Sequence, residues 1–196
     1  MIEGALDTIR EFYGCSRAER SQVLKISHIL AGLAVLHEIK STVAAKAAYC
    51  LHPIFQDSAS LAKYGTQVAK NLDPHVVLLV MEYRNQANAW LSDRVSALNK
   101  DEKYQNYSGW YPKEFTRTTK YGYTTQPSPG PLPEVRDMLI ADKVQNYTDF
   151  RIYHEATHPR SQELTLYFEA WLQALGVCPD TFQKLSRAAT SASLKN

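Results

Sequence analysis

The Ala-rich stretch at residues 42–51 constrains the fold of this chain more than any other part of the sequence. It reads TVAAKAAYCL, a run of small and apolar residues that favours a helix and lets neighbouring helices pack closely against it. We expect Ser41 to cap this helix at its N-terminus. Pro53 follows His52 at the far end, where its missing N–H and its clash with the carbonyl four residues back predict a kink or a new helix.

Apolar residues recur at three- and four-residue spacings along most of the remaining sequence, which is the period of an amphipathic helix. We expect Asp73-Pro74 to begin one helix and glycines at positions 14 and 176 to end two others. No stretch predicts a sheet. The expected helices cover residues 2–14, 17–40, 42–51, 58–72 with Ser58 as the cap, 74–90, 134–147, 148–157, 161–175 and 179–192. The sequence therefore predicts an all-α helical bundle.

Residues 99–133 break the helical pattern. Aromatic residues such as Tyr104 and Trp110 are mixed there with basic residues such as Lys113, and the stretch ends in QPSPGPLP at 126–133. Loops of this length within one domain are usually functional or mobile. The aromatic and basic side chains suit stacking on single-stranded nucleic acid, although a satellite core is the favoured alternative. We predict one domain over residues 1–196 with a long Tyr/Pro-rich insertion.

The composition is that of an ordinary globular protein. The chain has 196 residues, 44% hydrophobic and 21% charged, which suits one domain with a substantial core. A net charge of +2 gives no overall attraction to nucleic acid or to an anionic membrane. Three widely spaced cysteines, no signal-peptide pattern and no long apolar run predict a cytoplasmic protein without a membrane partner. The compact chain and its Tyr-rich insertion also suggest a viral accessory protein.

Three segments carry residue types that bind metals. They are Ile26-Ser27-His28, Leu51-His52-Pro53 and LIADKVQN at 139–146. Over about residues 20–176 the chain resembles the HD-domain phosphohydrolases, in particular the hydrolase domain of RelA/SpoT-type proteins, which removes pyrophosphate from guanosine alarmones. The resemblance implies that His28, His52 and Asp142 converge from three helices on one divalent metal, manganese or zinc. The alternative is that both histidines are core residues bonded to their neighbours.

Two positions depart from the pattern of that family. Pro53 stands where the family has an Asp ligand, and Gln56-Asp57 stands where it has the Glu-Asp pair that activates water. Asp57 follows Pro53 by about one helical turn. We expect it either to replace the lost ligand or to hold the attacking water, with Gln56 beside it.

Four further residues are candidates for substrate recognition. Arg84 and Asn88 share a helix face at positions i and i+4, where a guanidinium suits phosphate and an amide suits a base or ribose. The resemblance places Lys143 and Asn146 near the nucleotide. The alternatives are an internal hydrogen-bond network for the first pair and a solvated helix face for the second.

Two classes of function follow from this pattern. The first is a metal-dependent nucleotide pyrophosphohydrolase or phosphohydrolase of the HD type, whose substrate is a guanosine alarmone or a related nucleotide. The second is a catalytically degenerate protein of the same fold that binds a nucleotide, a small phosphorylated ligand or a protein partner. The loss of an acidic ligand at Pro53 favours the second class, and the three remaining ligand positions favour the first.

Residues 154–158 read HEATH and supply a remote third hypothesis. On one helix face, this HExxH pattern would give a metallopeptidase two zinc ligands, His154 and His158, and a general base, Glu155. Glu163 or Glu169 would be the third ligand. Proline follows at position 159, where the helix of such an enzyme continues, so a chance match at a helix end is the favoured explanation.

Overall fold

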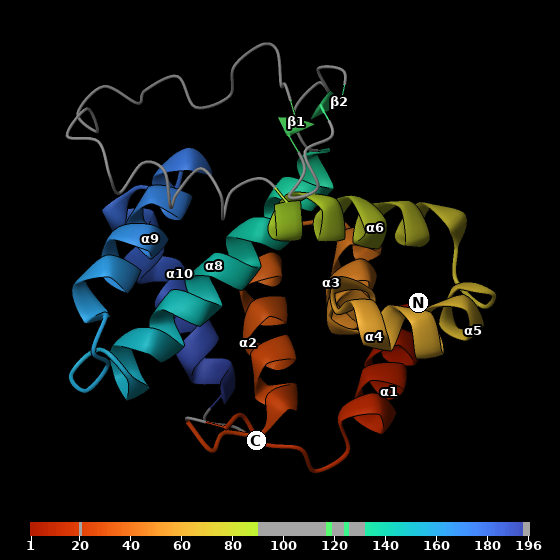
Figure 1. The fold of residues 1–196 in the computed structure, drawn as a ribbon, viewed down its shortest axis with the longest axis horizontal. Coiled ribbons are helices and arrows are strands. Elements are labelled where there is room, and N and C mark those ends of the chain that lie inside the picture. Colours follow the sequence, from red (N-terminus) through yellow and green to blue (C-terminus); the bar gives the residue numbers. More distant parts are fainter. Residues whose placement is uncertain (20, 90–116, 119–123, 126–131, 194–196) are drawn as a thin grey trace.

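The computed structural model describes residues 1–19, 21–89, 117–118, 124–125 and 132–193, and most of these residues are helical (Figure 1). The prediction of an all-α protein is confirmed. A pair of two-residue antiparallel strands, β1 (Arg117–Thr118) and β2 (Thr124–Thr125), is the exception. The helices are α1 (Ile2–Tyr13), α2 (Lys25–Glu38), α3 (Val43–Gln56), α4 (Ser58–Ser60), the π-helical turn η1 (Leu61–Gly65), α5 (Thr66–Ala69), α6 (Pro74–Ala89), α8 (Pro133–Tyr153), α9 (Ser161–Ala174) and α10 (Pro179–Ser193).

Helices α2, α3 and α8 meet at the centre of the bundle. Helix α8 crosses α2 and α3, α6 and α1 pack against α3, and α10 packs along α2 (Figure 1). Nine of the fourteen residues of α3 are buried, as its small and apolar sequence predicts. The predicted insertion at 99–133 lies outside the described residues except at 117–118, 124–125 and 132–133. None of the described helices is both long and apolar enough to cross a membrane.

Small residues let α2 and α3 approach closely. Gly32 of α2 faces the ring of Tyr49 of α3, and a Cβ atom at position 32 would lie 2.0 Å from the Tyr49 hydroxyl. Only glycine leaves room for this contact. The approach brings the residue one turn before Gly32, His28, close to α3.

We predicted that this helix begins near residue 17, but α2 begins at Lys25. The described residues between 17 and 24 fold back, with Arg17 bridging to Leu24 in antiparallel fashion and the Ala18 N–H bonded to the Val23 carbonyl. The Arg17 guanidinium donates to the Gln22 carbonyl at 2.6 Å. These local hydrogen bonds replace the helical ones that the apolar spacing predicted.

Two predicted caps were wrong by one residue. Thr42, and not Ser41, caps α3, because its hydroxyl accepts a hydrogen bond from the Ala45 N–H at 3.1 Å. Asp57, and not Ser58, caps α4 by accepting from the Ser60 N–H at 2.7 Å. Asp73 does begin α6 as predicted, because its carboxylate accepts from the His75 N–H at 2.8 Å.

Two helix boundaries also differ from the prediction. Helix α3 continues through Pro53 to Gln56, where the Arg84 guanidinium donates to the carbonyls of Phe55 and Gln56 in the last turn of the helix. Residues 133–153 form one helix, α8, where we predicted a break at 147–148. The predicted stop at Gly176 is confirmed by its positive φ of 73°.

Candidate metal centre

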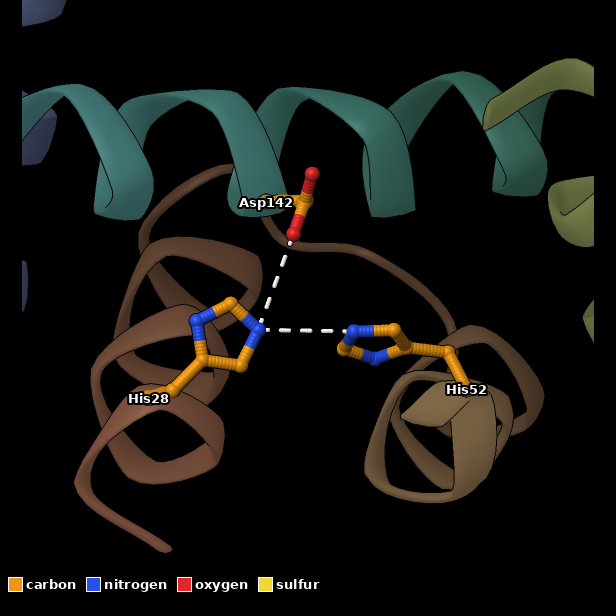
Figure 2. Close-up of side chains that lie close together, drawn as sticks. All are labelled: His28, His52 and Asp142. Atoms are coloured by element: carbon orange, nitrogen blue, oxygen red, sulfur yellow. Dashed lines mark hydrogen bonds and ion pairs between the residues drawn. The ribbon is translucent and has the colours of Figure 1, made fainter. Parts of the chain in front are cut away.

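The predicted ligands His28, His52 and Asp142 meet where α2, α3 and α8 come together (Figure 2). The Nε2 atoms of His28 and His52 are 3.4 Å apart, and His28 Nε2 is 3.6 Å from Oδ1 of Asp142. One ligand atom from each residue lies within 4.8 Å of the other two. His52 and Asp142 are buried, whereas the His28 side chain is 22% exposed. His28 is therefore the most exposed of the three side chains.

Pro53 has a direct effect on the ring of His52. Proline has no N–H, so the carbonyl of Tyr49, four residues earlier, lacks its normal helical partner. His52 Nδ1 lies 2.6 Å from that carbonyl oxygen. A carbonyl only accepts, so Nδ1 carries the proton. Burial, followed by the nearby His28, lowers the pKa of His52 to about 4. The neutral ring therefore presents an unprotonated Nε2 to the cluster.

His28 is held in a similar way by α8. Its Nδ1 lies 2.5 Å from Oε1 of Gln145, and the Gln145 amide nitrogen donates to Asp149 at 2.7 Å. A carboxylate only accepts, which fixes the amide with its nitrogen toward Asp149 and its oxygen toward His28. His28 Nδ1 is therefore the donor, and Nε2 faces His52 and Asp142 (Figure 2).

Asp142 is held by two neighbours on its own helix. Lys143 Nζ lies 2.8 Å from Oδ2, and the Asn146 amide donates to Oδ1 at 2.9 Å. Burial alone would raise the pKa of Asp142, but Lys143, His28 and His52 outweigh burial and hold that pKa well below its usual range. Lys143 also lies over the ring of Trp171, 4.6 Å from its centroid. Asp142 is thus ionised, and Oδ1 is the oxygen nearest His28.

The donor set fits a divalent metal. Two imidazole nitrogens and a carboxylate oxygen suit zinc or manganese. In a tetrahedral site with bonds of about 2.1 Å, neighbouring ligand atoms are about 3.4 Å apart, close to the two measured separations of 3.4 and 3.6 Å. Metal-bound histidines characteristically donate their second ring N–H to an oxygen, as both rings do here.

Two tyrosines line the cluster, and sequence reasoning missed both. The centre of the Tyr83 ring lies 5.0 Å from that of His52, and the centre of the Tyr49 ring lies 4.7 Å from it. The buried Tyr83 hydroxyl makes no hydrogen bond of ordinary geometry with the described residues. Burial and then Asp142 raise the pKa of Tyr83 well above its usual range. Tyr49 precedes His52 by three residues, so helical spacing could have identified it.

Several other predicted site residues gather around the C-terminal end of α3, and they lie outside the three-ligand cluster. Asp57 is exposed and uses its carboxylate to cap α4. Arg84 donates to the Phe55 carbonyl at 2.7 Å and to the Ser58 hydroxyl at 3.0 Å. Asn88 bonds both the carbonyl and the side chain of Gln56. These contacts join α3 to α6, as the alternative of an internal network predicted.

The HExxH pattern does not have the geometry that a metallopeptidase needs. Helix α8 ends at Tyr153, and residues 154–157 form a turn. His154 and His158 therefore do not lie one turn apart on a helix, and Glu163 pairs with Arg160. The predicted helix at 148–157 was wrong in its C-terminal part, which removes the basis of this hypothesis.

The fold and the cluster define a helical protein with a candidate two-histidine, one-aspartate metal centre. No family model matches the chain, and the searches of curated proteins and of solved structures also returned no match. The resemblance to HD-domain proteins therefore remains a prediction from the three sequence segments.

Proposed function

We propose that this protein is a metal-dependent phosphohydrolase of the HD type that acts on a phosphorylated nucleotide, with guanosine alarmones as the first class to test. The supporting observation is the convergence of His28, His52 and Asp142 with both Nδ1 atoms directed to oxygens. A cytoplasmic location suits this substrate and the three cysteines, all free thiols.

The roles of the residues follow from their contacts. A divalent cation at this site supplies a water of lowered pKa and polarises a phosphoryl oxygen. His28, His52 and Asp142 hold the cation, and Lys143 occupies the second carboxylate oxygen of Asp142, so that this ligand binds through one atom. Three single-atom ligands leave positions for water and substrate.

We assign Lys143 and Asn146 to the support of Asp142, in place of the nucleotide contacts that the resemblance implies. Both side chains already bond its carboxylate, and Lys143 is buried between Asp142 and Trp171. The substrate phosphate approaches past His28, the ligand with the most exposed side chain of the cluster. The negative charge of the phosphate is then attracted to the cation.

The second candidate is a nucleotide- or protein-binding relative that holds the metal without hydrolysis. It is favoured by Asp57, whose carboxylate caps α4 and lies outside the cluster. It is also favoured by Pro53, which stands where the family has an acidic ligand and leaves the Tyr49 carbonyl free to bond His52. Among the described residues, the three-ligand cluster contains only one carboxylate, that of Asp142, and it is a ligand.

The test is a hydrolysis assay on protein loaded with manganese or zinc. Guanosine alarmones and common nucleoside di- and triphosphates are incubated with wild-type protein and with Asp142→Asn, and released phosphate and pyrophosphate are measured. Asp142→Asn keeps the shape of the side chain but removes its charge. Hydrolysis by wild type alone supports the enzyme. Metal and nucleotide binding without hydrolysis supports the second candidate and contradicts the first.

A further inference from the structure

Asp149 is linked to the candidate metal ligand His28 through one buried amide. Gln145 is 2% exposed, and its nitrogen and oxygen face Asp149 and His28 at 2.7 and 2.5 Å. Burial raises the pKa of Asp149 against the opposing effect of the Gln145 hydrogen bond. Partial burial of this carboxylate costs free energy, which the hydrogen bond from Gln145 offsets in part.

We propose that Asp149 is a positioning residue that acts through Gln145 to keep the proton of His28 on Nδ1, which leaves the Nε2 lone pair for the metal. This inference rests on the proposed function of the cluster as a metal site. The amide of glutamine can turn by 180°, and either end can face an imidazole nitrogen. Among the described residues, the carboxylate of Asp149 decides which end does so, because it accepts hydrogen bonds and does not donate them.

The spacing along α8 supports this arrangement. Asp142, Gln145 and Asp149 follow one another by three and four residues, which places all three on one face of the helix. One face of α8 thus supplies a ligand and also the support for a second ligand that comes from α2. Any rotation or shift of α8 would move the Asp142 oxygen and the Gln145 oxygen together, so the two ligands stay in register.

The first experiment compares wild type with Asp149→Asn. Asparagine has the same size but can donate, so the Gln145 amide is free to turn and to present its nitrogen to His28. We expect ¹⁵N NMR of the metal-free variant to show His28 partly protonated on Nε2, where wild type shows Nδ1 alone. Because supporting hydrogen bonds of this kind typically contribute about 10- to 100-fold in metal affinity, we expect zinc affinity to fall by about that factor.

The matched control exchanges the two groups in the double variant Gln145→Glu with Asp149→Asn. The carboxylate introduced at position 145 would accept from His28 directly, and the amide introduced at position 149 would donate to that carboxylate. The order of donors and acceptors toward His28 is thereby restored. We expect this variant to regain the Nδ1 tautomer and most of the zinc affinity. A loss of affinity caused only by damage to packing would not be reversed by the exchange.

The outcomes separate the two proposals. An Asp149→Asn variant with the wild-type tautomer and wild-type zinc affinity would overturn the role of Asp149 while leaving the metal site intact. Failure of the exchange variant to recover the tautomer would overturn it as well. Wild-type protein that binds no zinc would contradict the proposed function, whereas the tautomer of the metal-free proteins would still decide whether Asp149 orients His28.

Discussion

The Nε2 atoms of His28 and His52 lie 3.4 Å apart, with each ring directing its Nδ1 to an oxygen acceptor. Two ring nitrogens with lone pairs, next to an ionised carboxylate, repel one another, and a positive group among them lowers this repulsion. A proton and a divalent cation are the two groups that fit, and they compete for the same atoms. Metal binding at this cluster therefore weakens as the pH falls.

The metal-free protein should lose stability between pH 7 and pH 5. The pKa of His52 is about 4 in the folded chain, against an ordinary value of 6.5. The unfolded chain therefore binds more protons in this range, and the free energy of unfolding falls on acidification, by about 2 kcal/mol for this group. Asp142 contributes little in this range, because its carboxyl is ionised in the folded chain and its ordinary pKa in the unfolded chain also lies below pH 5. Urea denaturation at both pH values measures the loss, and His52→Gln should show much less of it.

Pro53→Ala should change stability and metal affinity in opposite directions. Alanine restores a helical N–H to the Tyr49 carbonyl and removes a proline from the helix interior, so we expect the free energy of unfolding to rise by up to about 3 kcal/mol. The new N–H competes with His52 for that carbonyl, which loosens the ring and lowers zinc affinity. Thermal denaturation and zinc titration measure the two effects.

Pro53→Asp separates this account from the simple loss of a ligand. If the only consequence of Pro53 is a missing carboxylate, aspartate would raise metal affinity above that of wild type, as the resemblance implies. Equal losses of affinity in the alanine and aspartate variants would show that the orientation of His52 matters more than the extra ligand. Unchanged affinity in Pro53→Ala would contradict a role of the proline in holding His52.

Apolar spacing predicted most helices, because it is a local signal. The resemblance implied that His28, His52 and Asp142 lie together although they are far apart in the chain, and the structure brings them together. Local sequence signals gave wrong predictions where contacts between residues far apart in the chain decide the structure. Pro53 stays inside α3 since Arg84, from another helix, binds the end of α3. The support of His28 by Gln145 and Asp149 could have been read from their spacing after Asp142, but only once α2 was known to pack on that face of α8.

The roles of Lys143 and Arg84 show the limit of reading polar residues from sequence. Lys143 is on the buried side of α8, between Asp142 and Trp171, and the contact with Trp171 of α9 could not be foreseen without the packing of the helices. Arg84 and Asn88 do share one helix face as predicted, but that face meets α3. Helical spacing says which residues lie together and does not say what lies opposite them.

Lys143→Met should destabilise the protein strongly. Methionine keeps the apolar contact with Trp171 but leaves the Asp142 carboxylate buried without its cation, and removing one partner of a buried pair costs about 3–5 kcal/mol. Chemical denaturation measures this loss. The double variant with Asp142→Asn, which removes the orphaned charge, should recover much of the stability. A loss below about 1 kcal/mol in Lys143→Met would contradict the importance of this pair.

Gly32→Ala tests the close approach of α2 and α3. The new Cβ would lie 2.0 Å from the Tyr49 hydroxyl, so the Tyr49 ring must move, at a cost of about 1–3 kcal/mol. Because the Tyr49 carbonyl holds His52, we also expect weaker zinc binding. Gly4→Ala in α1 is the matched control, since nothing lies within 4 Å of its Cβ position and alanine favours a helix by about 0.5–1 kcal/mol. Equal stability of the two variants would contradict the proposed packing.

The metal content of the purified protein tests the central claim most directly. Wild type and His52→Ala are incubated with zinc, desalted and measured by elemental analysis, with circular dichroism to show that both are folded. The account predicts about one zinc per wild-type chain and a large loss in the variant, because two of the three ligands alone bind weakly. Folded wild-type protein without zinc, or equal zinc in both proteins, would contradict a metal centre formed by His28, His52 and Asp142.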